Sequence, residues 1–281
     1  MKRLIVLLGV MGVSLSALLV RWSTAPSLIM ALYRMVFAAA LLTPAALRKE
    51  RFSGLPRREA GLSVLSGAFL GLHFTCYFEA LNRTSIASAV VLVDTEVLFV
   101  ALASVLILRK KLSSRAWMAV LTAFGGSALV ALVDRSAGAG ALSGDLIALA
   151  GAVCVSVYTM LGAVCRERLS TTAYTYLVYL SASGTLLAIA LAGGTPLAGY
   201  GPVNLWTGLG MAVFCTLLGH SVFSWGLKYL PPAFISTVKL LEPVFSAAYG
   251  LFLFGERPGV LVILGGALIL LGIGLYSREE A

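Results

Sequence analysis

Long apolar runs alternate with short polar breaks along the whole chain. A helix that crosses a bilayer needs about 20 predominantly apolar residues, and ten runs come close to that length. The breaks between them contain proline, glycine or charged residues, which commonly end helices. The expected spans are residues 4–20, 28–47, 60–81, 85–108, 115–133, 144–164, 173–192, 206–227, 233–254 and 259–276. The pattern predicts an all-α integral membrane protein with ten transmembrane helices.

Composition supports the same class of protein. Of the 281 residues, 59% are hydrophobic and 12% are charged, whereas a soluble domain carries about 25% charged residues. The formal net charge of +9 would also suit nucleic acid. However, the basic residues lie in the loops between apolar runs, which is the pattern of membrane topology. We therefore expect the lipid bilayer, and no nucleic acid, as a partner.

The cysteines give no sign of a metal site. Cys76, Cys154, Cys165 and Cys215 all lie inside apolar runs. The sequence has neither a Cys-x-x-Cys motif nor Cys/His ligand spacing, so we interpret them as small buried hydrophobic residues without disulfides. The sequence predicts no metal and no cofactor.

The distribution of lysine and arginine predicts the orientation in the membrane. With a cytoplasmic N-terminus, fifteen basic residues fall on the inner side and four on the outer side. The inner residues are Lys2, Arg3, Arg48, Lys49, Arg51, Arg57, Arg58, Arg109, Lys110, Lys111, Arg115, Arg166, Arg168, Lys228 and Arg278. The outer residues are Arg21, Arg83, Arg135 and Arg257. Because this bias sets topology, we expect a multi-pass protein of the cell (inner) membrane with both termini cytoplasmic.

Two halves of the chain share a pattern of residues. The pairs that coincide at a shift of 142 or 146 residues include Gly9 with Gly151, Val13 with Val155, Glu96 with Glu242 and Phe99 with Phe245. The first apolar run thus has a counterpart inside the chain, which favours a retained helix over a cleaved signal peptide. We expect two related halves, residues 1–134 and 144–281, joined by a link at 135–143.

The number of helices in each half predicts their relative topology. Five helices are an odd number, so the second half enters the membrane from the opposite side. Inverted-topology repeats are typical of secondary transporters, with the binding site near mid-membrane at the repeat interface. The expected fold is therefore two inverted five-helix repeats.

The ninth expected span contains charges near its middle. Lys239 and Glu242 stand three residues apart, so on a helix they share a face and can pair. Pro243 follows at once and removes a backbone donor, which frees a carbonyl about one turn earlier. In lipid such a break is tolerated only beside protein or water. Two interpretations stay open: the charges line an internal cavity with Pro243 as a hinge, or they form a structural ion pair.

Motifs in and around this span resemble a known family. They are Leu-Glu-Pro-Val-Phe at 241–245, Phe-Gly-Glu-Arg-Pro at 254–258, a weaker copy at 94–99 with 109–113, and the stretch 226–233. The chain is similar to the EamA-type branch of the drug/metabolite transporter superfamily over essentially its whole length. The resemblance implies alternating access around a central cavity, and the family includes exporters of amino acids, amines and other metabolites. Val97 stands where the second copy has Pro243, so we expect the two halves to bend differently.

Charged side chains inside a bilayer are costly and usually face the interior of the helix bundle. Those within the expected spans are Arg34, Glu79, Asp94, Glu96, Lys239 and Glu242. Asp94 and Glu96 lie roughly 200° apart around a helix, so both cannot face one cavity squarely. We expect one of them to meet substrate or a cation and the other to pair with Arg34 or Lys239. Glu79 lies near a span end, and an interfacial place for it stays open.

Two histidines occupy nearly equivalent places in the halves. On α-helices, His220 shares a stripe with Thr216 and Ser224, and His73 shares one with Tyr77. Histidine can relay protons near neutral pH, but each can also be a hydrogen-bonded packing residue. The expected substrate or coupling-ion pathway comprises Arg34, His73, Tyr77, Asp94, Glu96, His220, Lys239 and Glu242, with Pro243 as its hinge.

The sequence contains no P-loop, HExxH or GxSxG motif, so we assign no catalytic residue. Transport would then be driven by gradients or exchange, with a proton or another cation coupled through carboxylates. The intramembrane charges sum to −2, which favours a cationic or zwitterionic substrate. We expect a secondary active transporter, an exporter or exchanger of a small polar or amphipathic metabolite, as a monomer or homodimer. The alternatives are an intramembrane enzyme and a lipid-linked precursor flippase.

Overall fold

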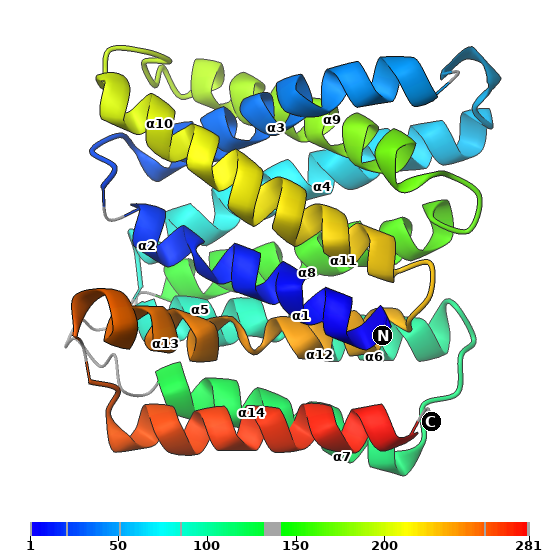
Figure 1. Cartoon of the computed structure of the whole chain (residues 1–281), viewed down its shortest axis with the longest axis vertical. Helices are drawn as coiled ribbons and strands as arrows, with labels where there is room; N and C mark the ends of the chain where they lie inside the picture. The colour runs from blue at the N-terminus through cyan, green and yellow to red at the C-terminus, as the bar shows by residue number, and fades with distance from the viewer. Residues whose placement is uncertain are drawn as a thin grey trace. The chain divides into compact units, whose positions relative to one another are not determined.

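The computed structural model describes residues 2–20, 22–50, 52–84, 86–131, 142–255 and 257–279. Within these ranges the regular elements are helices (Figure 1). Eight of the described helices are long and apolar enough to cross a membrane. The two other expected spans correspond to α7 (Ser114–Ala131) and to a pair of shorter helices, α12 (Pro232–Lys239) and α13 (Glu242–Phe254). Most of the predicted link at 135–143 lies outside the described residues.

The chain forms two units, and each takes helices from both halves of the sequence. The first unit contains Met1–Thr75 and Val157–Tyr229, and the second contains Cys76–Ser156 and Leu230–Ala281. Two long helices, α4 (Arg57–Leu81) and α8 (Leu142–Cys165), contribute residues to both units.

Besides α4 and α8, the first unit contains α1 (Lys2–Ser14), α2 (Ser16–Val20), α3 (Ser27–Lys49), η1 (Phe52–Gly54), α9 (Thr171–Ala192), α10 (Pro202–Gly210), η3 (Met211–His220) and α11 (Ser221–Gly226). In this unit α3 packs along α9, and α1 packs along η3. Gly12 permits the close approach of α1 to η3, because a β-carbon there would lie 2.6 Å from the carbonyl oxygen of Phe214.

The span expected as one α-helix at 206–227 has a different middle. Its ten-residue segment η3 is a π-helix, in which backbone bonds reach the fifth residue instead of the fourth. The wider turn brings residues five apart onto one face beside those four apart, so the expected neighbourhood of His220 and Thr216 stays a prediction. Thr216 and Ser221, five residues apart, meet one side chain: the hydroxyl of Tyr179 lies 3.3 Å from the Thr216 carbonyl and 2.8 Å from the Ser221 hydroxyl.

One buried side chain closes the turn between α2 and α3. The amide oxygen of Asn204, in α10, accepts hydrogen bonds from the backbone of Thr24 (2.9 Å) and Ala25 (3.1 Å) and from the hydroxyl of Ser23 (2.9 Å). Its amide nitrogen donates to the hydroxyl of Thr24 at 3.0 Å. Asn204 thus supplies the partners that the non-helical backbone at 23–25 needs inside an apolar protein.

The second unit contains α5 (Ile86–Asp94), α6 (Glu96–Leu106) and α14 (Val260–Glu279) in addition to α7, α12 and α13. The helix α7 lies beside α14 along much of its length (Figure 1). A β-carbon added at Gly126 would lie 2.5 Å from the carbonyl oxygen of Gly265, so these two backbones touch. Small residues at such crossings are typical of helix pairs in membranes. The shorter helix α12 packs against α6.

Both halves of the sequence contain a broken helix at the same place in the pattern. The turn Leu240–Leu241 separates α12 from α13, with hydrogen bonds to the third residue back (3.2 and 3.1 Å), and Pro243 follows in the first turn of α13. The expected break at Pro243 is therefore confirmed. In the first half the interruption is smaller, so the two halves differ as expected: Thr95 alone separates α5, which ends at Asp94, from α6, which begins at Glu96. Thr95 also keeps the helical bond to the carbonyl of Val91 at 3.2 Å.

The first break contains no proline, and a side-chain hydroxyl competes there for a backbone carbonyl. The hydroxyl of Thr95 donates to the carbonyl oxygen of Leu92 at 2.5 Å, competing with the helical partner of that carbonyl. The amide of Leu98 then bonds to the carbonyl of Thr95 at 2.9 Å, three residues back. Each half-helix beyond a break starts with a glutamate, Glu96 in α6 and Glu242 in α13.

Candidate functional site

An ion pair joins the two broken helices of the second unit. The Nζ atom of Lys239 lies 2.7 Å from Oε1 of Glu96, and the two side chains are 17% and 11% exposed. Glu96 is the first residue of α6 and Lys239 is the last residue of α12. The expectation that Asp94 or Glu96 pairs with Arg34 or Lys239 is thus confirmed in one of its forms, Glu96 with Lys239.

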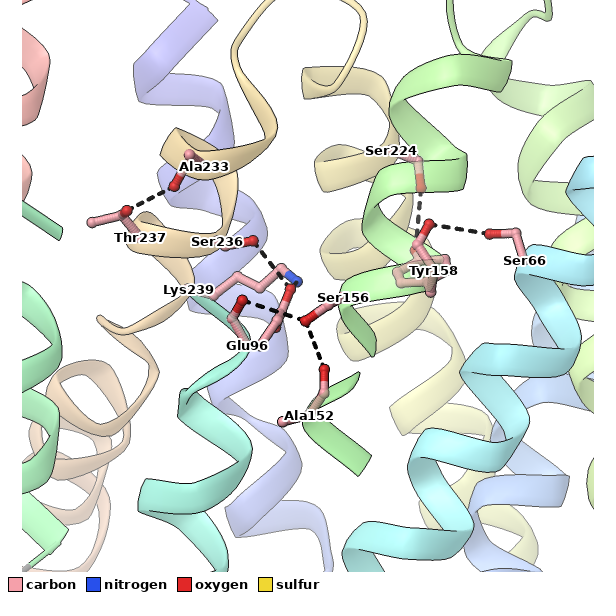
Figure 2. Close-up of polar contacts among 10 residues, drawn as sticks. All are labelled: Ser66, Glu96, Ala152, Ser156, Tyr158, Ser224, Ala233, Ser236, Thr237 and Lys239. Carbon is pink, nitrogen blue, oxygen red and sulfur yellow. Dashed lines mark hydrogen bonds and ion pairs between the residues drawn. The ribbon is translucent and has the colours of Figure 1, made fainter. Parts of the chain in front are cut away.

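Helix ends stabilise both charges of this pair. A helix N-terminus favours an anion and a C-terminus favours a cation, and Glu96 and Lys239 occupy those ends. Ser236, one turn before Lys239, donates its hydroxyl to Oε1 of Glu96 at 3.1 Å. The hydroxyl of Ser156, in α8, lies 3.4 Å from the Glu96 backbone carbonyl and donates to Ala152 at 2.7 Å. Figure 2 shows these contacts converging on Glu96.

The other acidic candidates belong to the same unit. Asp94, the last residue of α5, accepts a short hydrogen bond from Ser127 of α7. Glu242 is the first residue of α13. The charges of Asp94 and Glu242 interact with each other, and both interact with Tyr77. With Glu96, this unit carries three carboxylates against one lysine among the predicted residues, an excess of negative charge that suits a cationic group.

Arg34 lies in the first unit, in α3, and is 4% exposed. Its Nε donates to the hydroxyl of Thr216 at 2.7 Å, and its Nη2 donates to the carbonyl oxygen of Cys215 at 3.3 Å. The guanidinium also stands 5.1 Å from the ring centroid of Phe74. Thr216 and Cys215 lie in the π-helix η3. These partners are neutral, so they occupy donors and stabilise the cation without cancelling its charge.

The two histidines share an aromatic neighbour in the first unit. The ring of Phe74 lies 5.3 Å from that of His73 and 6.1 Å from that of His220. His220 also lies 6.2 Å from the rings of Tyr158 and Phe223. Both histidines are nearly buried, at 9% and 8% exposure. These ring contacts suit either interpretation, so the packing role and the proton-relay role both stay predictions.

A hydroxyl network beside this cluster was not predicted. Ser66 donates to the carbonyl oxygen of Tyr158 at 3.2 Å and bonds to the hydroxyl of Tyr174 at 2.8 Å. The hydroxyls of Tyr158 and Ser224 lie 3.4 Å apart (Figure 2). The sequence offered one sign of this network: the hydroxyl residues lie in the middle of apolar spans, where a hydroxyl group needs a hydrogen-bond partner.

Two other features of the described residues, the possible metal ligands and a groove on the surface of α4, do not indicate a functional site. Among the described residues, no three His, Cys, Asp or Glu side chains gather as metal ligands would. A groove of about 580 Å³ between α4 and α9 has seven lining residues, and all of them are uncharged. The candidate chemistry of the chain therefore belongs to the charges at the helix breaks and around Arg34.

Comparison with known sequences gives two matches to one family. The profile of the EamA-like transporter family matches residues 2–132 and again residues 142–278. An uncharacterized transporter of Archaeoglobus fulgidus is 24% identical over 262 residues, which cover 89% of this chain and 88% of that protein. The pseudopaline exporter CntI of Pseudomonas aeruginosa is 25% identical over 240 residues, which cover 83% and 81%. Two matches in tandem are consistent with an inverted repeat.

Comparison with solved structures supports the fold. A crystal structure with 17% sequence identity has a TM-score of 0.85 and covers 99% of this chain and 98% of its own. At that identity the likeness concerns the arrangement of the helices and carries nothing about substrate.

Proposed function

We propose that this chain, which belongs to the EamA-like transporter family, is a secondary active transporter that exports or exchanges a small zwitterionic or cationic metabolite by alternating access. Transport as such follows from the family. The similarity to a protein named as an exporter supports outward movement of the substrate. The substrate class rests on the charges of the second unit.

The observation that carries the proposal is the ion pair between Glu96 and Lys239. In secondary transporters, substrates and coupling ions bind where transmembrane helices are discontinuous, because half-helix ends present charge and free backbone groups there. Here one member of the pair starts a half-helix and the other ends one. Ionisable residues within transmembrane segments are costly, and they commonly mark substrate or ion pathways.

A zwitterion suits this arrangement better than a neutral solute does. Its ammonium group can take the place of Lys239 on the Glu96 carboxylate, and its carboxylate can take the place of Glu96 on the lysine. Each buried charge then stays paired throughout the exchange, so neither incurs the cost of an isolated charge. An amine without a carboxylate can replace only Lys239 as the partner of Glu96. The negative charges of Asp94 and Glu242 in the same unit would attract such a cation.

The same pair offers a route to coupling. A carboxylate in a low-dielectric site can take up a proton, and protonation of Glu96 would release Lys239. A conformational change follows when ligand or proton stabilises one state more than the other. Substrate and proton would thereby compete for one set of groups, which is the condition for exchange of one against the other.

The test is transport by the purified full-length chain in proteoliposomes. Vesicles preloaded with an unlabelled amino acid or amine should accumulate the labelled compound by counterflow. The variant combining Glu96→Gln with Lys239→Met should be present in the membrane and inactive. The matched control combines Glu79→Gln with Arg83→Gln, which removes an ion pair of 2.6 Å whose side chains are 44% and 49% exposed. That control should transport normally.

Two results would overturn the proposal. Wild-type rates in the Glu96→Gln, Lys239→Met variant would reduce the pair to a structural contact. Failure of the wild-type chain to carry any water-soluble solute, together with movement of a lipid-linked precursor, would identify a flippase.

A further inference from the structure

A basic groove lies between the start of α7 and the end of α14, in the second unit. It has a volume of about 300 Å³ and is lined by Arg115 and Met118 of α7 and by Leu275 and Arg278 of α14. All four side chains are exposed. The groove thus combines two guanidinium groups with two flexible apolar side chains. A ligand with both an anionic part and an apolar part would contact all four.

The two arginines are available to an external anion. To the described residues, neither guanidinium makes a hydrogen bond or an ion pair. Guanidinium groups match phosphate oxygens with two parallel hydrogen bonds. Because Arg115 and Arg278 line one groove, the groove offers guanidinium donors from two helices to a phosphate group.

The loop that leads into α7 adds to the same charge. Arg109, Lys110 and Lys111 are exposed and lie directly before Ser114, where α7 begins. The backbone of Arg109 has φ 52°, in the left-handed region. Gly255, at the equivalent place in the second half, has φ 69°. Glycine adopts this conformation without strain and arginine does not, so the first half carries a cation where the backbone would favour glycine.

We propose that the basic groove formed by Arg115, Met118, Leu275 and Arg278 binds an anionic phospholipid. The phosphate lies between the two arginines, and the start of an acyl chain lies against Met118 and Leu275. Basic pockets between transmembrane helices on the cytoplasmic side are suited to anionic headgroups, and the bias of basic residues predicts that these helix ends face the cytoplasm. The apolar half of the groove favours a lipid over a free phosphate ion.

Such a lipid would hold together a helix pair that is already tightly packed. The backbones of α7 and α14 approach closely at Gly126 with Gly265 and again at Ala119 with Gly272, and the groove lies next to this second contact. A ligand that binds only the folded chain stabilises it in proportion to its concentration and affinity. The lipid should therefore raise the thermal midpoint of the purified protein.

The experiment is native mass spectrometry of the full-length chain in a neutral detergent, titrated with phosphatidylglycerol or with phosphatidylcholine of the same acyl chains. Phosphatidylglycerol should bind more tightly and raise the thermal midpoint. Combining Arg115→Gln with Arg278→Gln should weaken this binding by roughly thirtyfold, the usual effect of two basic residues at an anionic surface. The control combines Arg57→Gln with Arg58→Gln, which removes equal charge from the first turn of α4, and should bind as wild type.

Two further measurements distinguish a lipid from a small anion and test the groove with a variant that keeps both arginines. Inorganic phosphate and glycerophosphoglycerol, which lack acyl chains, should not displace the lipid at equal concentration. Full displacement by either would overturn the lipid assignment in favour of a small-anion site. Leu275→Trp fills the groove and keeps both arginines, so it should also weaken lipid binding. Wild-type lipid affinity in this variant or in the arginine variant would refute the site, and Leu275→Trp decides if the arginine variant does not fold.

Discussion

Lys239, the last residue of α12, lies 2.7 Å from the carboxylate of Glu96, the first residue of α6, so one ion pair joins two helix ends whose residues are 143 positions apart in the sequence. Each break exposes backbone groups and a helix end, and the pair neutralises both ends at once. Burial of the two charges costs free energy, and their mutual attraction and the helix ends offset that cost. Single and double substitutions can separate these two contributions.

Glu96→Gln should destabilise the protein by about 3–5 kcal/mol, because it leaves the Lys239 charge poorly exposed and without its carboxylate. Adding Lys239→Met should recover most of that loss, since the lysine charge that had lost the Glu96 carboxylate is then gone as well. The thermal midpoint in detergent measures both effects. The half-exposed pair of Glu79 and Arg83 serves as control and should contribute less than about 1 kcal/mol. An unchanged midpoint for Glu96→Gln alone would contradict a tightly coupled pair.

Substitution of single acids should show which carboxylate couples transport to a gradient. Glu242→Gln removes a titrating group from the start of α13 and leaves the Glu96–Lys239 ion pair in place. We expect counterflow to persist while stimulation by a pH gradient disappears. Asp94→Asn is the companion variant, because Asp94 is held by Ser127. If only Asp94→Asn abolishes the stimulation, the coupling site belongs to α5 and not to α13.

Pro243→Ala restores a backbone donor in the first turn of α13. It should insert into the membrane normally and transport several-fold more slowly, because a break at the pathway serves as a hinge. Thr95→Val, which removes the hydroxyl bond to Leu92, tests the other break, and Thr95→Ser is its control. Transport at the wild-type rate in Pro243→Ala would assign the proline to packing alone.

Asn204→Leu should lower the thermal midpoint markedly. The substitution removes the acceptor for three part-buried donors at residues 23–25. A fully buried donor left without a partner costs about 1–3 kcal/mol, and each of these donors should cost less because water reaches it. Asn204→Asp keeps the acceptor and should be milder. A midpoint for Asn204→Leu within a degree or so of wild type would show that water replaces the lost oxygen.

Orientation in the membrane is open to a direct test. A single cysteine in place of Ser136, with the four native cysteines removed, should react with a membrane-impermeant thiol reagent from outside the cell. Ser136 belongs to the part of the chain outside the described residues. Reaction from the cytoplasmic side only would reverse the predicted orientation.

The membrane fold was predictable because spanning length and apolar composition leave few alternatives. The family resemblance, based on motifs such as Leu-Glu-Pro-Val-Phe at 241–245, is confirmed by the two profile matches. The break before Pro243 was predictable for a local reason, the missing backbone donor. Glu79, left open between two places, is at the helix end beside Arg83 and half exposed.

Features that depend on packing were not predictable in the same way. Nothing in the composition of 211–220 distinguishes a π-helix from an α-helix, since the same apolar residues suit both. The break at Thr95 arises from one hydroxyl bond that an ordinary mid-helix threonine also makes without breaking the helix. Asn204 lies just outside an expected span, where a polar residue calls for no explanation. The choice of Glu96 over Asp94 as the partner of Lys239 required knowing which helix faces which.

The two breaks differ in permanence. Proline lacks its donor in every conformation, so α12 and α13 cannot merge into one regular helix. Val97, at the corresponding position, keeps its amide hydrogen, and the break beside it involves one hydroxyl contact from Thr95 to the Leu92 carbonyl. The break before Pro243 is thus fixed by the covalent chemistry of proline, whereas the break at Thr95 is held by a side chain. The helix that contains Pro243 can change its angle but cannot lose its interruption, and the helix that contains Thr95 has no such covalent limit.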